Sequence, residues 1–257
     1  MLKCATALLA SLTIWISLVC CQLGEYQDKL WLHRTNSLEK MEEKEARFPN
    51  YEIDLVYREK TGTFDVTHDA DTTFHLSLDA YLHSIKTDSD SVWLDIKNLN
   101  EHNMKAARNR LEQLCQKYAI PRRHFIVETR NLNALAHFTQ AGFYTSYYVD
   151  FPKPSKLDDE AIDTCIAHLQ RVADSHKVCA LSFPGWWYAD IHEKLHRDII
   201  IHIALMLDQR NQKYILFILH PDPLNCIRFK LYPQIGLIFA GHILHIFFRD
   251  ILKKCTS

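Results

Sequence analysis

The chain has 257 residues, 47% of them hydrophobic, with 30 Lys and Arg against 31 Asp and Glu and a formal net charge of −1 at pH 7. This length suits one large domain or two small ones, and the near-zero charge excludes the strong positive field that attracts nucleic acid. We therefore expect no nucleic-acid partner, and any phosphate site must come from a local group of residues.

Residues 1–21 combine Lys3 with an apolar run that stops before Gln22. This pattern is typical of a secretory signal peptide or an uncleaved membrane anchor. The last four residues, Leu-Val-Cys-Cys, resemble an imperfect lipobox in which Cys21 would carry a lipid. We expect an exported protein, which is periplasmic, secreted or attached to a membrane as a lipoprotein, with a single domain over residues 26–257.

Beyond the leader, short apolar runs alternate with segments of helical spacing. Strands are expected at residues 30–33, 51–57, 91–97, 124–129, 143–149, 178–182, 199–205 and 214–219. Helices are expected at residues 38–44, 103–118, 132–141, 159–175 and 191–197, and the apolar run 235–248 is expected to be a packed helix or an interfacial one. About eight strands with intervening helices favour an α/β fold of the (β/α)8 TIM-barrel type, with an open doubly wound sheet as the alternative.

Three acidic residues lie on two of these strands. Glu52 and Asp54 are two residues apart, so their side chains share one face of a strand, and Asp95 lies near the end of the next one. In a (β/α)8 barrel the C-terminal ends of the strands meet at one mouth, so we expect the three carboxylates to converge. Hard oxygen ligands with open positions suit Ca²⁺ or Mg²⁺ better than zinc, which predicts a divalent-cation site.

Cationic and titratable residues follow the same strands. His33 and Arg34 end the first strand, His68 follows the short extended segment 64–67, and Lys97 lies two residues after Asp95. Imidazole titrates near neutral pH, so the two histidines suit general acid and base roles. Arg34 and Lys97 suit neutralisation of a phosphoryl group.

The order of these residues resembles the glycerophosphodiester phosphodiesterase family, which belongs to the phospholipase C-like phosphodiesterases. The motifs that carry the resemblance, within residues 30–150, are His33-Arg34, Glu52-x-Asp54, His68-Asp69 and Asp95-x-Lys97. The resemblance implies a (β/α)8 barrel, a divalent cation and hydrolysis of a small phosphodiester substrate.

The resemblance also assigns roles. It implies that Glu52, Asp54 and Asp95 bind the metal, and that His33 and His68 act as acid and base. Arg34 and Lys97 match groups that contact phosphate in the family. One histidine would take a proton from the substrate's own hydroxyl or from water, and the other would give a proton to the leaving alcohol.

Three features depart from the family pattern. Thr35 stands where Gly is usual, Asn36-Ser37 stands near the usual Glu-Asn-Thr, and Asp95 replaces a Glu. The segment HRTNSLEK also resembles the menorin-like relatives of the family. The alternatives are therefore a phospholipase C-like or sphingomyelinase D-like lipid phosphodiesterase, and a non-catalytic barrel with a binding role.

Two further candidates lie on later elements. Glu128 ends the strand 124–129, where it can line the mouth or form a structural salt bridge with Arg130 or a neighbouring residue. Trp187, in the aromatic group Trp186 to Tyr188, is expected to contact the substrate, although packing is the alternative.

Overall fold

The computed structural model describes residues 30–44, 50–85, 91–195, 200–207 and 213–220, all within one compact unit, Gln27–Leu224. Its strands are β1 (Leu30–Leu32), β2 (Asn50–Arg58), β3 (Thr63–Val66), β4 (Ser91–Ile96), β5 (Phe125–Thr129), β6 (Tyr144–Tyr148), β7 (Ala180–Ser182), β8 (Ile200–Leu207) and β9 (Lys213–His220). Its helices are α2 (Leu38–Lys44), α3 (Leu78–His83), α4 (Met104–Tyr118), α5 (Leu132–Gln140), α6 (Asp159–Asp174) and α7 (Tyr188–Lys194), with short 3-10 turns at Arg122–His124, Pro154–Lys156 and Gly185–Trp187.

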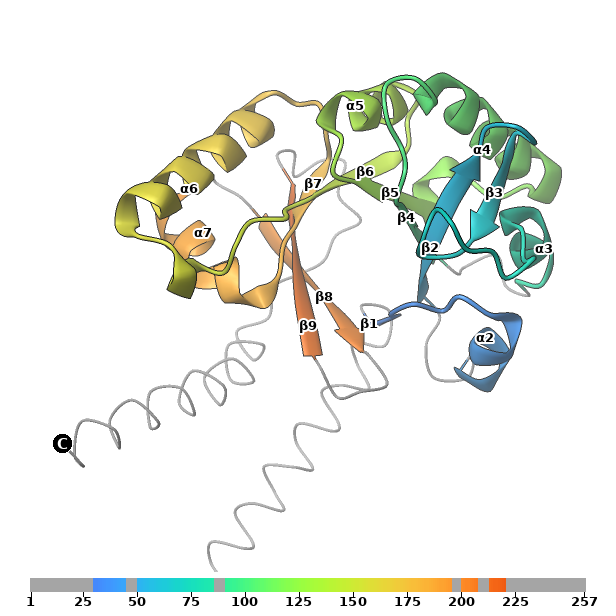
Figure 1. Cartoon of the computed structure of the whole chain (residues 1–257), viewed down its shortest axis with the longest axis horizontal. Helices are drawn as coiled ribbons and strands as arrows, with labels where there is room; N and C mark the ends of the chain where they lie inside the picture. Colours follow the sequence, from blue (N-terminus) through green and yellow to red (C-terminus); the bar gives the residue numbers. More distant parts are fainter. Residues whose placement is uncertain (1–29, 45–49, 86–90, 196–199, 208–212, 221–257) are drawn as a thin grey trace, which may run out of the picture. The chain divides into compact units, whose positions relative to one another are not determined.

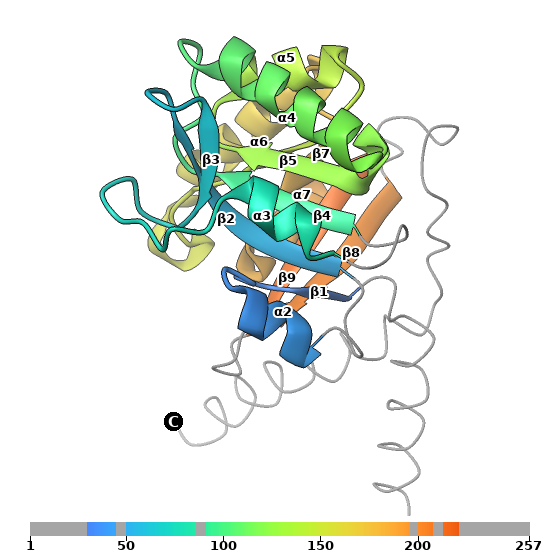
Figure 2. The same ribbon diagram turned by 90° about the vertical axis from the view of Figure 1, so that its right-hand side faces the viewer.

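The strands form one curled sheet in the order β7-β6-β5-β4-β2-β1-β8-β9, with β3 paired to β2 (Figure 1). Every pairing is parallel except β2 with β3 and β8 with β9. Helix α5 packs on β5 and β6, and the edge strands β7 and β9 contact each other across the curl. Figure 2 shows α3, α4 and α5 on the outer side of β4 and β5. The predicted fold class, an α/β fold of the TIM-barrel type, is confirmed.

The last strand departs from the ideal pattern. A parallel crossover needs about a dozen residues, usually a helix. Only residues 208–212, which lie outside the described residues, separate β8 from β9. The two strands therefore pair antiparallel as a hairpin, where a complete (β/α)8 barrel has another parallel strand and its helix.

The inner face of the curl carries a layer of apolar side chains at the start of the strands. Trp31, Trp93, Ile126 and Ala180 form a buried cluster against which Tyr144 packs. The Trp31 and Trp93 rings meet edge to face with 5.5 Å between centroids. Because side chains alternate along a strand, the next inward positions lie two residues further on, and there the sequence becomes polar.

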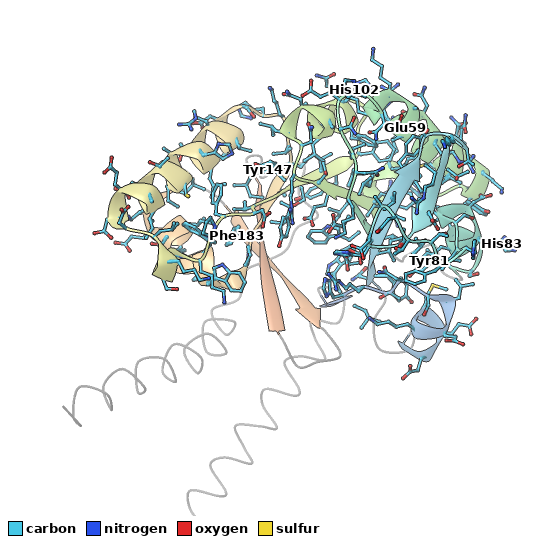
Figure 3. All side chains as sticks on the ribbon, in the orientation of Figure 1. Glu59, Tyr81, His83, His102, Tyr147 and Phe183 are labelled. Atoms are coloured by element: carbon cyan, nitrogen blue, oxygen red, sulfur yellow. The ribbon has the colours of Figure 1, made fainter. Side chains whose placement is uncertain are left out.

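Strand β2 is buried on both faces, which explains why its charged residues do not lie in water. Ile53 and Leu55, which alternate with the acids, are both 0% exposed, and Glu52 and Asp54 are buried as well. Figure 3 shows the side chains around this strand, among which Tyr81 is also 0% exposed. Glu52 and Asp54 therefore require either a compensating charge inside the protein or a bound proton.

No helix among the described residues is long and apolar enough to cross a membrane. The leader at residues 1–21 and the apolar run at 235–248 lie outside the described residues.

Candidate active site

Three carboxylates from two neighbouring strands come together on the inner face of the sheet. Asp54 on β2 lies directly opposite Asp95 on β4, and Glu52 lies two residues before Asp54. One oxygen atom from each side chain lies within 4.8 Å of the other two. Glu52 is 2% exposed and Asp54 0%, while Asp95 is half-buried. The strand alternation expected from the sequence thus gathers all three acids at one point.

The ammonium group of Lys97 lies among these acids. Its Nζ atom is 2.6 Å from Asp54 Oδ1 and also contacts Asp95 Oδ2. Although burial opposes its charge, Asp95 and Asp54 hold the pKa of Lys97 above its ordinary value. Lys97 is therefore charged at neutral pH and compensates part of the negative charge.

The buried acids differ in how strongly the protein favours their ionised form. Burial raises the pKa of Glu52 well above its ordinary value, and the charges of Asp54 and Asp95 raise it further. Burial also acts on Asp54, but Lys97 and the Asn36 amide outweigh it and lower the pKa of that carboxyl. The geometry thus disfavours three ionised acids beside one lysine, and a further cation would relieve the repulsion.

The geometry of the three acids fits a hard divalent cation. Ligand oxygens lie about 2.0–2.6 Å from Mg²⁺ or Ca²⁺, so two ligands of one ion are at most about 5 Å apart. The separation of 4.8 Å or less among the oxygens of Glu52, Asp54 and Asp95 meets this condition.

His33 and Arg34 lie beside the acids on the turn that follows β1. His33 Nε2 is 3.7 Å from Glu52 Oε2, and the Arg34 backbone N–H donates to the same oxygen at 2.6 Å. Arg34 has a φ of 51°, a left-handed conformation in the turn that follows β1. Its guanidinium Nε lies 3.7 Å from Asp54 Oδ2, and the side chain is 53% exposed, so it can also reach a ligand from solvent.

His68 lies on the loop after β3. Antiparallel pairing places Val66, the last residue of β3, opposite Leu55 on β2. The loop that carries His68 therefore begins next to Asp54, the neighbour of Leu55 in the sequence. His68 Nδ1 is 2.6 Å from Asp69 Oδ1, and the imidazole is 44% exposed. Among the described residues, its hydrogen-bond partner is therefore Asp69 and not one of the three acids.

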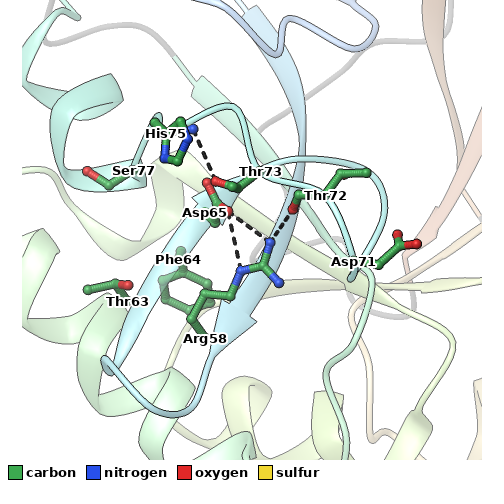
Figure 4. Close-up of a pocket in the computed structure, with 9 residues that line it drawn as sticks. All are labelled: Arg58, Thr63, Phe64, Asp65, Asp71, Thr72, Thr73, His75 and Ser77. Carbon is green, nitrogen blue, oxygen red and sulfur yellow. Dashed lines mark hydrogen bonds and ion pairs between the residues drawn. The ribbon is translucent and has the colours of Figure 1, made fainter.

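Arg58 anchors the loop that carries His68. Its guanidinium pairs with Asp65 at 2.9 Å and donates to the backbone carbonyl of Thr72 (Figure 4). It also donates to the backbone carbonyl of Ala70. Arg58, Asp65 and Thr72 also line a surface cavity of about 460 Å³, together with His75 and Ser77. Because Arg58 is engaged by Asp65 and the two carbonyls, its charge is already compensated.

A fourth acid continues the row of inward-facing residues. Glu128 on β5 lies beside Asp95 in register and beside Ser146 on β6, and it is 3% exposed. Its carboxyl accepts from the Ser182 hydroxyl, which also contacts the Ser146 hydroxyl. Burial, and then the charge of Asp95, raises the pKa of Glu128 from 4.5 to about 8. Glu128 lines the inner wall and does not pair with Arg130.

Arg130 instead pairs with Asp150, at 2.7 Å on the surface. The salt bridge considered for Glu128 is therefore made by a different acid.

The structure does not support a substrate contact by Trp187. Its side chain is 0% exposed and packs edge to face against Phe151, with 5.6 Å between centroids. A 3-10 turn over Gly185–Trp187 directs Trp187 into the core, while the preceding Trp186 is 44% exposed. Lys153 lies over the ring of Trp186, 4.5 Å from its centroid. Trp187 therefore has the packing role that was the alternative.

Sequence reasoning missed two contributions to this site. The sequence singled out Asn36 only as a departure from the family pattern, but the Asn36 amide bonds Asp54, while Ser37 caps α2 by accepting from Lys40 N. Ser146 and Ser182 lie next to Glu128 on the inner wall. Extending the inward alternation to β6 and β7 would have identified the serines, whereas no local pattern distinguishes the Asn36 contact from a cap.

The chain is similar to solved structures of phosphodiesterases. No protein-family model matches it, and no curated protein matches it significantly. A glycerophosphodiester phosphodiesterase from Parabacteroides distasonis ATCC 8503 matches 64% of this chain and 75% of its own, with 15% identity and a TM-score of 0.46. A protein from Silicibacter pomeroyi DSS-3, assigned as a glycerophosphoryl diester phosphodiesterase, matches 54% of this chain and 71% of its own, with 13% identity and a TM-score of 0.38. These identities are too low to transfer residue roles.

Replacing Lys97 with Met should destabilise the metal-free protein. The change removes the ammonium between Asp54 and Asp95 and leaves buried negative charge uncompensated, which typically costs about 3–5 kcal/mol. Urea denaturation in EDTA would measure the free energy of unfolding. Lys117→Met, which removes the exposed pair with Asp79, is the control and should have a much smaller effect. Equal losses in the two variants would contradict the role given to Lys97.

Replacing Glu128 with Gln should flatten the pH dependence of stability. Between pH 4.5 and about 8 the folded protein keeps a proton on Glu128 that the unfolded chain has released, so this carboxyl lowers the free energy of unfolding as pH rises. Gln cannot release that proton. Urea denaturation at several pH values in this window should show a smaller decrease for Glu128→Gln than for the wild type. Glu193→Gln, at an exposed position, should keep the wild-type slope.

Proposed function

We propose that the protein is a divalent-cation-dependent phosphodiesterase that hydrolyses small glycerophosphodiester-like substrates. The observation that carries this proposal is the convergence of Glu52, Asp54 and Asp95, with His33, Arg34 and Lys97 around them. Three acids and adjacent cations at one end of a curled α/β sheet suit an anionic ester held through a metal ion. The order of the sequence motifs gives independent support.

The three carboxylates would hold Ca²⁺ or Mg²⁺, and the ion would polarise a phosphoryl oxygen as a Lewis acid. Arg34 and Lys97 would neutralise the remaining charge of the phosphate, because both lie within 4 Å of Asp54 and Arg34 extends into solvent. Trp187 has no part in this proposal, because it is fully buried.

His33 and His68 would transfer protons. Glu52, 3.7 Å from His33 Nε2, can orient the first imidazole, and Asp69, 2.6 Å from His68 Nδ1, can fix the second. One of the two would accept the proton of the attacking hydroxyl or water, and the other would protonate the leaving alcohol. We also propose, from residues 1–21 alone, that the protein is exported, with Cys21 as a candidate site of lipid attachment.

Removing divalent cations should abolish the reaction. The purified protein is expected to hydrolyse bis(p-nitrophenyl) phosphate and glycerophosphocholine, to lose this activity in EDTA, and to regain it when Ca²⁺ or Mg²⁺ is added in excess. Phosphorus NMR would identify the end product: a glycerophosphate monoester supports the proposal, whether water or the substrate's own hydroxyl attacks first, whereas a cyclic phosphate that accumulates without hydrolysis indicates a phospholipase C-like or sphingomyelinase D-like enzyme. Absence of turnover across the substrate panel, with cation uptake intact, would favour a binding role.

Replacing His33 with Ala should reduce kcat/KM by at least about 100-fold, because a positioned general acid or base typically contributes a factor of 10² to 10⁴. His102→Ala is the control, since His102 is exposed on the loop before α4 and should not affect turnover (Figure 3). Circular dichroism would verify that both variants are folded. Unchanged kcat/KM in His33→Ala would refute the role of His33.

A further inference from the structure

The Asn36 side chain makes two hydrogen bonds to a single residue, Asp54. Its Nδ2 atom donates to Asp54 Oδ2 at 2.7 Å, and its Oδ1 atom accepts from the Asp54 backbone N–H at 2.9 Å. A carboxylate only accepts and a backbone N–H only donates, so just one orientation of the amide satisfies both contacts. The side chain therefore fixes both the backbone and the carboxylate of Asp54.

This contact extends the pairing of β1 with β2 beyond the end of β1. Leu32 is the last strand residue of β1, opposite Tyr51, and the next backbone bond comes from Thr35 N to Glu52 O at 2.8 Å. The Asn36 amide oxygen then occupies the place of a strand carbonyl and accepts from Asp54 N. Asn36, a residue of the turn, thus extends the hydrogen bonding between β1 and β2 through its side-chain oxygen. Its Nδ2 atom bonds the Asp54 carboxylate.

The two oxygens of Asp54 consequently have different surroundings. Oδ2 is held by Asn36, with the Arg34 guanidinium 3.7 Å away, whereas Oδ1 faces Lys97 at 2.6 Å. Asp54 is 0% exposed, so water does not supply an alternative partner for the Asn36 bond. Oδ1 is therefore paired with the Lys97 ammonium, whereas Oδ2 is held by the Asn36 amide.

We propose that Asn36 is a positioning residue that restricts Asp54 to binding a cation through one oxygen and thereby favours Mg²⁺ over Ca²⁺. This inference rests on the proposed function. Mg²⁺ requires near-octahedral geometry with compact, single-oxygen ligands, whereas Ca²⁺ accepts carboxylates through one or both oxygens and tolerates more ligands. Releasing Oδ2 lets Asp54 rotate and bind through both oxygens, which only Ca²⁺ exploits.

The chain offers a matched control for loss of the hydrogen bonds themselves. Asn98 binds the same strand in the same way: its Oδ1 atom accepts from Tyr57 N at 2.8 Å and its Nδ2 atom donates to Tyr57 O at 2.9 Å. Asn36 and Asn98 are both half-buried. The Asn98 amide contacts no carboxylate of the cluster, so Asn98→Leu removes an equivalent pair of bonds without affecting Asp54.

Calorimetric titration of metal-free wild type, Asn36→Leu and Asn98→Leu with MgCl₂ and with CaCl₂ tests the proposal. Loss of a side chain that orients a metal ligand typically weakens binding by about 10 to 100-fold. Asn36→Leu should show this loss for Mg²⁺ and a smaller one for Ca²⁺, so that the ratio of the two dissociation constants shifts at least several-fold toward Ca²⁺. Asn98→Leu should keep the wild-type ratio even if its thermal stability falls.

A purely structural role would lower stability in both variants and leave the ratio unchanged. That result, or an equal shift of the ratio in Asn98→Leu, would overturn the inference while leaving the proposed function intact. Cation uptake that is absent in the wild type would instead overturn the proposed function. Asn36→Ala provides a second variant if Leu prevents folding, and a crystal structure of either variant without cations should show the Asp54 carboxylate rotated away from its wild-type position.

Discussion

The burial of several carboxylates on adjacent parallel strands is the constraint on which this site depends. Asp54 and Asp95 are direct neighbours in register, Glu52 lies one inward position below them, and Glu128 lies beside Asp95. Hydrophobic residues at these positions would pack without any electrostatic cost, as Trp93 and Ile126 do one layer away. Water does not compensate the charge of Glu52 or Asp54, so the compensation comes from Lys97, from bound protons or from a cation.

The same constraint shifts the pKa values of the buried acids in different directions. Asp54 is stabilised as an anion by Lys97 and Asn36, whereas burial raises the pKa of both Glu52 and Glu128. A cation bound by Glu52, Asp54 and Asp95 would replace the proton that Glu52 otherwise favours, which couples cation uptake to proton release. Glu128 does not need that ion, since the Ser182 hydroxyl already donates to its carboxyl.

Strand periodicity predicted most of this arrangement. The two-residue spacing of Glu52 with Asp54 and of Asp95 with Lys97 was enough to place these side chains on one face, because alternation is a local property of the backbone. The antiparallel return of β9 was missed, although the short connection 208–212 leaves no room for a crossover helix. Trp187 could not be separated from Trp186, because a 3-10 turn decides which ring is buried. The Asn36 contact depends on how a turn folds over β2, which no sequence period encodes.

The departures of Thr35 and Asp95 from the family pattern are compatible with the geometry of the candidate active site. Thr35, where Gly is usual, needs no special backbone conformation, since the left-handed residue of this turn is Arg34. Thr35 is fully buried, and its hydroxyl donates to Leu32 O at 2.9 Å, which stabilises the turn that presents His33. Asp95 is one methylene shorter than Glu, yet one of its oxygens still lies within 4.8 Å of ligand atoms on Glu52 and Asp54. Direct register with Asp54 makes a longer side chain unnecessary, because neighbouring strands already hold the two carboxylates side by side.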